Sequence, residues 1–145
     1  MRKQQWINKI EESNETLHPY STHLLKHILL PELLGKEEEM ILYWAGKAMF
    51  RKLSETEIND LSEFFFKAGW GQLTLIKEKR NERIYELTAP LMEKDRPFTL
   101  ESGFLSESTE AETKCVTEAT YEVIKKDPCT CRITVRWDPK DVFHV

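Results

Sequence analysis

Three cysteines are the residues of this chain best suited to metal or redox chemistry. Cys129 and Cys131 are separated by one threonine, and side chains two apart on a strand share a face, so both thiols could approach one ion. Cys115 lies near the far end of the same expected hairpin. A structural zinc site takes four ligands, whereas a buried free cysteine commonly behaves as a small apolar residue. The pattern favours core thiols, and a metal- or redox-responsive module using Cys115, Cys129 and Cys131 is the alternative.

Two histidines have a spacing that can hold a metal ion on one side of a helix. His23 and His27 lie four residues apart, but no glutamate follows His23 directly and no third ligand is evident. The apolar stripe of this helix consists of Leu24, Leu25, Ile28 and Leu29. We therefore expect both histidines to flank the stripe in solvent.

Catalytic motifs are absent from the sequence. It contains no G-x-S-x-G, no phosphate-binding loop and no metal triad. The acidic run Glu37–Glu39 is explained by its position at the start of a helix, where carboxylates interact favourably with the helix dipole. We expect a protein that is not an enzyme and needs no cofactor.

The most detailed structural signal is a β-hairpin over residues 115–137. Its second strand alternates apolar and polar side chains, and the first strand alternates with the same period of two. Placing Val123 opposite Cys131 puts oppositely charged or matching side chains together, and such cross-strand pairs help select a register. The predicted pairs are Glu122–Arg132, Thr120–Thr134 and Glu118–Arg136.

The elements before this hairpin are mostly helical. Ser21 can cap a first helix that Pro31 ends or kinks, and a second helix covers about residues 37–52. Ser54 and Glu57 form a capping box for a third helix. A hairpin within residues 73–89 and a fourth helix from Thr99 follow. This order predicts an α+β fold: about four helices packed on one face of a four-stranded antiparallel sheet, in one domain over residues 19–145 after a flexible arm, residues 1–18.

Composition narrows the possible partners and the compartment. A net charge of −4 argues against a nucleic-acid-binding protein, because such proteins display a basic face. No run of about 18 apolar residues exists, so no membrane span is expected. Three cysteines without a secretory signal indicate a reducing cytoplasm.

Three segments carry a resemblance to a known family: Tyr43-Trp44-Ala45-Gly46, Ser102-Gly103-Phe104-Leu105 and Cys131-Arg132-Ile133-Thr134-Val135. With the order of elements, they resemble the four-vinyl-reductase-like superfamily, which includes subunits of the TRAPP vesicle-tethering complex. Over about residues 20–137 the chain looks most like the YslB-like family of small cytoplasmic proteins of Bacillus and its relatives.

The resemblance implies a non-enzymatic module that binds a small hydrophobic molecule or pairs with a protein through its helices. Several relatives carry a metal-binding cysteine pair on the final hairpin, but Val123 occupies the position expected for the earlier cysteine. The TRAPP-type acyl site, a cysteine on a helix, has no counterpart because all three cysteines lie on expected strands.

Two sets of residues follow from the expected packing of helices against the sheet. A ligand pocket is expected between the second and fourth helices and the sheet, and the candidates for lining it are small and aromatic side chains: Trp44, Ala45, Ala48, Phe65, Phe104 and Tyr121. Gly46 lies inside a good helix, where glycine costs about 1 kcal/mol relative to alanine. Its surface suits close packing within the chain, a pocket or a subunit interface. Gly46 and Phe66, an aromatic that points away from the core stripe, are the interface candidates for a homodimer.

Overall fold

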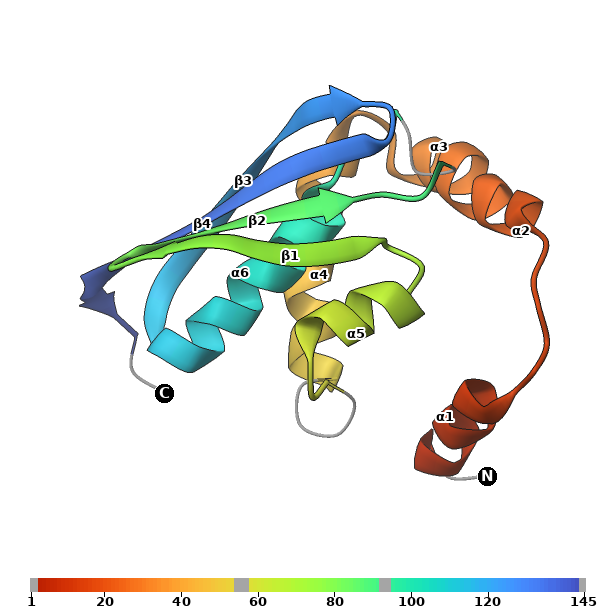
Figure 1. The fold of residues 1–145 in the computed structure, drawn as a ribbon, viewed down its shortest axis with the longest axis horizontal. Coiled ribbons are helices and arrows are strands. Elements are labelled where there is room, and N and C mark those ends of the chain that lie inside the picture. The colour runs from red at the N-terminus through yellow and green to blue at the C-terminus, as the bar shows by residue number, and fades with distance from the viewer. Residues whose placement is uncertain (1–2, 54–57, 92–94, 144–145) are drawn as a thin grey trace.

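The computed structural model describes residues 3–53, 58–91 and 95–143. Its elements, labelled in Figure 1, are α1 (Lys3–Glu12), α2 (Pro19–His23), the π-helical η1 (Leu24–Leu29), α3 (Leu30–Leu34), the 3₁₀-helical η2 (Gly35–Glu37), α4 (Glu38–Leu53), α5 (Leu61–Lys67), β1 (Gln72–Lys79), β2 (Glu82–Thr88), α6 (Thr99–Thr113), β3 (Cys115–Lys126) and β4 (Cys129–Val142). None of the helices within these ranges is long and apolar enough to cross a bilayer.

The four strands form one antiparallel sheet in the order β1-β2-β4-β3. Helices α4, α5 and α6 lie on one side of this sheet (Figure 1), and α6 packs against both β3 and β4. The side chains that point toward the helices are buried, among them Tyr85 and Leu87 on β2 and Ile133 and Val135 on β4. The predicted α+β architecture is therefore confirmed.

The register of the C-terminal hairpin agrees with the sequence. β3 and β4 pair Val123 with Cys131, and the three expected cross-strand pairs follow: Glu122–Arg132, Thr120–Thr134 and Glu118–Arg136. Because buried and exposed side chains alternate along the central part of both strands, a slip of one residue would expose the buried set. This penalty explains why the pairing could be read from sequence.

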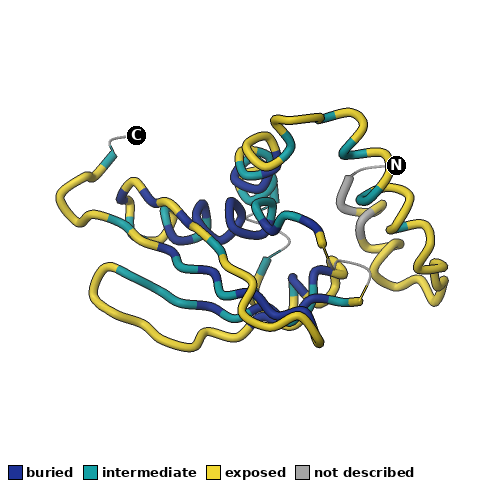
Figure 2. Tube along the Cα trace, turned by 90° about the horizontal axis from the view of Figure 1, so that it is seen from above, coloured by how far each residue is buried: buried dark blue, intermediate teal, exposed yellow. Residues whose placement is uncertain are grey.

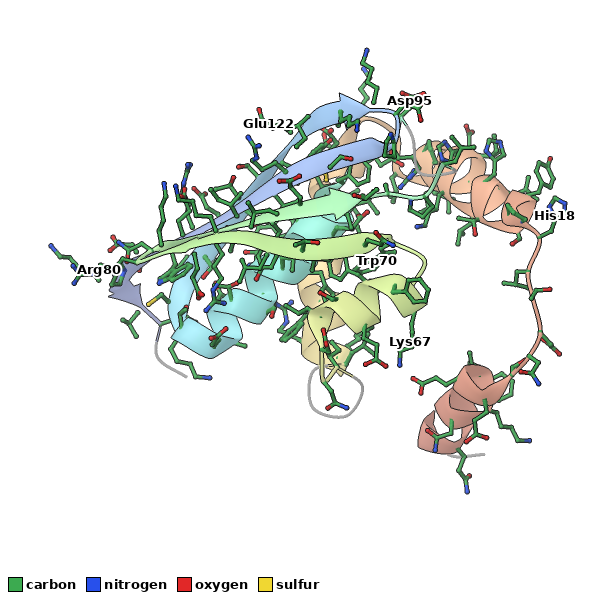
Figure 3. All side chains as sticks on the ribbon, in the orientation of Figure 1. His18, Lys67, Trp70, Arg80, Asp95 and Glu122 are labelled. Carbon is green, nitrogen blue, oxygen red and sulfur yellow. The ribbon has the colours of Figure 1, made fainter. Side chains whose placement is uncertain are left out.

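Phe104 of α6 is at the centre of an aromatic core. Its ring stacks on Phe64 with the centroids 4.8 Å apart, and it meets the rings of Phe65, Trp70 and Phe50 edge to face. Figure 3 places Trp70 between α5 and β1, and Figure 2 shows buried residues gathered where the helices meet the sheet. Edge-to-face and offset packing of this kind fixes the angle between helices, because each ring edge faces a neighbouring π face.

Two expected helix boundaries differ from the structure. α5 begins after Asp60, whose carboxylate accepts hydrogen bonds from the backbone N–H groups of Ser62 and Glu63. The expected capping box of Ser54 and Glu57 lies outside the described residues. Pro31 does not end the first helix. The chain stays helical from Pro19 to Leu34. The π turn of η1 directly precedes α3, in which Pro31 is the residue that lacks an N–H.

Part of the N-terminal arm is helical. Residues 3–12 form α1, which Figure 1 shows set apart from the sheet and joined to α2 by residues 13–18. Trp6 and Ile10 are exposed on it. Glu11 accepts a hydrogen bond from Lys67 of α5 at 3.3 Å, and Figure 3 shows Lys67 pointing toward α1. The flexibility of this arm stays a prediction.

Candidate functional site

The helix over residues 19–34 directs its apolar side chains away from the domain. We call this face the apolar ridge: its side chains are exposed by 43% to 68%, and its members are Leu24, Leu25, Ile28, Leu29 and Leu33. None of the residues in α2, η1 or α3 is buried. Leucine-rich helices normally turn such a stripe toward the core. An uncovered stripe of this size is typical of an interaction surface.

The opposite face of the same helix is held to the body by Arg96. This arginine is 9% exposed, and its guanidinium donates hydrogen bonds to the backbone carbonyl of Lys26 and, at 3.4 Å, to the Glu38 carboxylate of α4. Lys26, His27, Leu30 and Leu34 on this side are only partly exposed. A buried charged group with two acceptors from different elements fixes their relative orientation. The outward direction of the ridge is therefore built into the fold.

The π turn of η1 changes which residues of this helix share a face. The N–H of Leu30 donates to the carbonyl of Leu25, five residues earlier, and Pro31 has no N–H of its own. One wide turn shifts the residues after it around the helix axis, because each π turn takes more residues than an α turn. Such turns occur frequently at functional sites.

Further apolar side chains are exposed on the first turns of α4 and on α5. Met40, Ile41 and Trp44 are 54%, 38% and 58% exposed, and Phe66 is 70% exposed. Phe66 thus points away from the core, as the sequence indicated, but its role at a subunit interface stays a prediction. Leu33, Met40 and Ile41 were not among the candidate residues, although Leu33 continues the four-residue spacing of Leu25 and Leu29.

The six expected pocket residues do not share one environment. Phe65 and Phe104 are fully buried in the aromatic core, whereas Trp44 is exposed on the outside of α4. Ala45, Ala48 and Tyr121 are partly exposed. The ring of Tyr121 lies 5.7 Å from that of Phe98, and burial raises the pKa of its hydroxyl. A common cavity lined by all six residues is therefore not the arrangement observed.

Gly46 lies in a contact within the chain. A Cβ at this position would overlap the carbonyl oxygen of Leu100 and lie 2.8 Å from the backbone nitrogen of Phe104, both in α6. A Cβ on Gly103 would likewise overlap the carbonyl oxygen of Tyr43 in α4. Gly46 is buried because α4 and α6 pack at backbone contact, which is the close packing within the chain that its sequence position suited.

The cysteines occupy two separate places. Val123 faces Cys131, and Cys115 lies eight residues before Val123 on the same strand, or roughly 26 Å along an extended chain. Cys129 and Cys131 belong to the hydrophobic core, and burial raises the pKa of the Cys131 thiol well above its ordinary value, so it is held protonated. Thiolates bind metals, so this environment does not suit the metal-site alternative.

His23 and His27 form a ring stack rather than a metal clip. Their rings lie 5.1 Å apart, and Tyr20 stacks on His23 at 5.8 Å. His23 is exposed as expected, but His27 is partly covered, because the helix turns its leucines outward instead. Among the described residues, no group of three or more histidine, cysteine or acidic side chains is placed to hold an ion.

A buried polar network joins α4, α6 and β3, and sequence patterns did not indicate it. Ser106 donates to the Thr117 carbonyl at 2.9 Å and accepts from Lys47 at 3.1 Å and from the Tyr43 hydroxyl at 3.2 Å. The Lys47 ammonium also lies 3.5 Å from the Glu107 carboxylate, and only 6% of Lys47 is exposed. Glu107 Oε2 is buried without a hydrogen bond and is held by the charge of Lys47. Buried polar networks of this kind fix how elements are positioned against one another. Its members have partners inside the fold, which indicates a structural role.

Comparison with known proteins places this architecture in a family. The family model described as "Protein of unknown function (DUF2507)" matches residues 19–136. The uncharacterized protein YslB of Bacillus subtilis (strain 168) is 34% identical over 131 residues, covering 86% of this chain and 88% of YslB.

Two solved structures resemble the fold at lower identity. A vinyl-4-reductase family protein of Methanocaldococcus jannaschii aligns with a TM-score of 0.61 at 21% identity, over 89% of this chain and 86% of that one. A doubly substituted Tt H-NOX protein aligns with a TM-score of 0.51 at 17% identity, over 79% and 69%. The fold resembles that of the vinyl-4-reductase family protein. The expected relation to YslB-like proteins is confirmed, and the chain belongs to the DUF2507 family.

Proposed function

We propose that this chain is a non-enzymatic protein-interaction domain of the bacterial cytoplasm, which recognises an apolar partner surface through the apolar ridge. The single observation that carries the proposal is the direction of the helix over residues 19–34, which exposes five large aliphatic side chains. Soluble monomers rarely expose contiguous apolar patches beyond a few hundred Å² without a functional reason.

The ridge is suited to recognition because it is held in place before any partner arrives. Arg96 ties the back of the helix to α4 through Lys26 and Glu38. A surface that is already ordered loses less conformational entropy on binding than a flexible segment would. The proposal of a reducing compartment is supported by Cys115, Cys129 and Cys131, which are all buried and form no disulfide.

A small hydrophobic ligand is the second candidate, and one feature favours it. An open depression on the ridge side of the helix is lined by apolar side chains with a polar residue at either end: Ser21, Leu24, Leu25, Ile28, Leu29 and Glu32. A flat apolar molecule could lie there. The aromatic core around Phe104 offers less, because stacked and edge-to-face rings already occupy it.

Native mass spectrometry can test the proposal with a matched pair of variants. Leu25→Gln with Ile28→Gln removes apolar surface from the ridge, and Leu91→Gln removes a leucine outside the ridge that is even more exposed, at 83%. We expect the wild type and the Leu91 variant to carry added mass that the ridge variant lacks. An added protein chain supports the first candidate, and an added mass of a few hundred daltons that leaves on denaturation replaces it with the second.

A different result would contradict both candidates. If the wild type is a bare chain and also fails to enhance the fluorescence of 1-anilinonaphthalene-8-sulfonate, a dye that binds exposed apolar surface, the ridge does not recognise apolar partners.

A further inference from the structure

We infer that the partner of the apolar ridge is a second copy of this chain, whose helix over residues 19–34 packs antiparallel against the first about a two-fold axis at Leu29. This inference rests on the proposed function, because it names the occupant of the same surface. It is carried by the sequence of the exposed helix, by the surface that remains uncovered and by the fixed direction of the helix.

The helix sequence is self-complementary when two copies run in opposite directions. Residues 24–34 read Leu-Leu-Lys-His-Ile-Leu-Leu-Pro-Glu-Leu-Leu, and this string is nearly symmetric about Leu29. Around an axis at Leu29, Leu25 of one copy lies opposite Leu33 of the other. Leu29 lies on the axis and meets its own counterpart. Apolar residues thus meet apolar residues along the exposed face of the helix.

An isologous interface requires this kind of symmetry. In a two-fold dimer the same patch serves both subunits, so a residue that contacts its counterpart must suit that counterpart in both directions. A ridge adapted to an unrelated protein has no reason to be symmetric about its own centre. The near-palindrome of residues 24–34 therefore favours a second copy over a different partner.

The exposed apolar area is also close to the interface area of a stable dimer. Figure 1 shows α3 leading into the start of α4. Along the chain, η2 connects the helix that bears the ridge to α4, and α4 exposes Met40, Ile41 and Trp44. With the five ridge residues these make eight side chains. At on the order of 90 Å² each they offer about 700 Å² per copy, close to the roughly 800 Å² per partner of a standard interface. Homodimer interfaces are more apolar than other surfaces, as this one is.

The helix is accessible for such packing because its anchoring contacts lie on the other face. Arg96 binds the Lys26 carbonyl from the side of the body, and the partly covered residues Leu30 and Leu34 face the same way. A second helix can therefore approach Leu25, Leu29 and Leu33 without displacing any contact that holds the first.

Sedimentation equilibrium of variants with opposite charges at Leu25 and Leu33 tests whether the chain dimerises and whether the two helices pack in this antiparallel register. Leu25→Glu alone and Leu33→Arg alone each place an unpaired charge against a leucine of the other copy, and each should weaken dimerisation by at least about 100-fold. The two substitutions in one chain place opposite charges at both symmetry-related contacts. The double variant should recover at least about tenfold of the loss. Leu91→Arg is the matched control and should leave the dimer unchanged.

Other outcomes separate this inference from the proposed function. A monomeric wild type that binds 1-anilinonaphthalene-8-sulfonate, and loses the dye on Leu29→Arg, overturns the dimer but keeps the ridge as a binding surface. A monomer that does not bind the dye overturns both. A dimer that tolerates all ridge substitutions shows that the copies meet elsewhere, and a dimer lost in the single variants without recovery in the double variant excludes the antiparallel register. Circular dichroism confirms folding of each variant, which is expected because the substituted positions are exposed.

Discussion

Gly46 and Gly103 face one another across the contact between α4 and α6. Because each lacks a side chain, each leaves room for the backbone of the other helix. A methyl group on Gly46 would overlap the Leu100 carbonyl, and one on Gly103 would overlap the Tyr43 carbonyl. Neither glycine has a positive φ, so the close approach, rather than backbone conformation, explains both.

Gly46→Ala and Gly103→Ala should each destabilise the protein by about 1–3 kcal/mol, because the helices must separate to admit the methyl group. At a helix position without this contact, the same change would stabilise by up to about 1 kcal/mol. Urea unfolding followed by circular dichroism measures the difference, with Ala45→Gly as the reference for propensity alone. A gain in stability at Gly46 would mean that the helices are not in backbone contact.

Lys47→Ala should cost about 3 kcal/mol of folding free energy, because it leaves the buried Glu107 carboxylate without its buried cation. Arg51, 3.3 Å from Glu107, can compensate in part. Adding Glu107→Leu to Lys47→Ala removes the stranded charge and should restore more than half of the loss. If the double variant is as unstable as the sum of the single variants, the two side chains are not coupled in the fold.

Stability should fall in acid through the pair of Arg83 and Glu112. Two hydrogen bonds from the guanidinium, at 2.7 and 3.0 Å, hold the pKa of the Glu112 carboxyl below its ordinary value of 4.5. The ionised form is therefore favoured by folding. Its contribution is complete above pH 4.5 and disappears as the pH falls through the lower, folded-state pKa. Unfolding midpoints measured from pH 7 down to pH 3 should drop less steeply in Glu112→Gln, and the difference should shrink in high salt. If the unfolding midpoints of the wild type and Glu112→Gln fall equally steeply with pH, Glu112 does not contribute to the loss of stability in acid.

Cys131→Ser should destabilise the chain by about 1–3 kcal/mol, because a hydroxyl replaces a thiol in an apolar core. Cys131→Ala is the control that removes the sulfur without adding a polar atom, and it should cost less. Since burial raises the pKa of this thiol, it should also resist thiol reagents at pH 8 until the protein unfolds. An unfolding midpoint that falls when a chelator is added would instead revive the metal-binding alternative.

Charged side chains on neighbouring strands of the exposed sheet face allow a test of strand pairing. Arg136 lies opposite Glu118 on β3 and opposite Glu82 on β2, but its hydrogen bond, at 2.6 Å, goes to Glu82. A double-mutant cycle of Glu82 with Arg136 should therefore show a favourable coupling that is larger than that of Glu118 with Arg136. The reverse order would indicate that Arg136 turns toward β3 in solution.

These relationships show which parts of the molecule the sequence could predict. The hairpin of β3 and β4 was predicted residue by residue, because period-two alternation and cross-strand charges are local and agree with one another. The pairing of β2 with β4 joins segments more than 40 residues apart and was not predicted, because an apolar face on each strand does not show which strands are neighbours. Helix α5 was placed correctly by its apolar spacing, and only its N-terminal boundary was shifted.

The candidate site was predicted less well, for a physical reason. Hydrophobic spacing shows that Leu24, Leu25, Ile28 and Leu29 share a face, but it does not show whether that face meets the core or the solvent. The direction is set by Arg96, which lies 70 residues away in sequence from the carbonyl it binds. Gly46 shows the same limit: its lack of a side chain indicated a close approach, and only the structure identifies α6 as the neighbour.

The strand order β1-β2-β4-β3 has a consequence for synthesis of the protein on the ribosome. β2 is complete at Thr88, but the strand that covers its inner edge begins only at Cys129. During translation the first hairpin must wait with that edge unpaired until some fifty more residues, through Val142, have left the exit tunnel. Closure of the sheet therefore waits for its last strand, and the interval before it closes is when chaperone capture or edge-to-edge aggregation of nascent chains would compete.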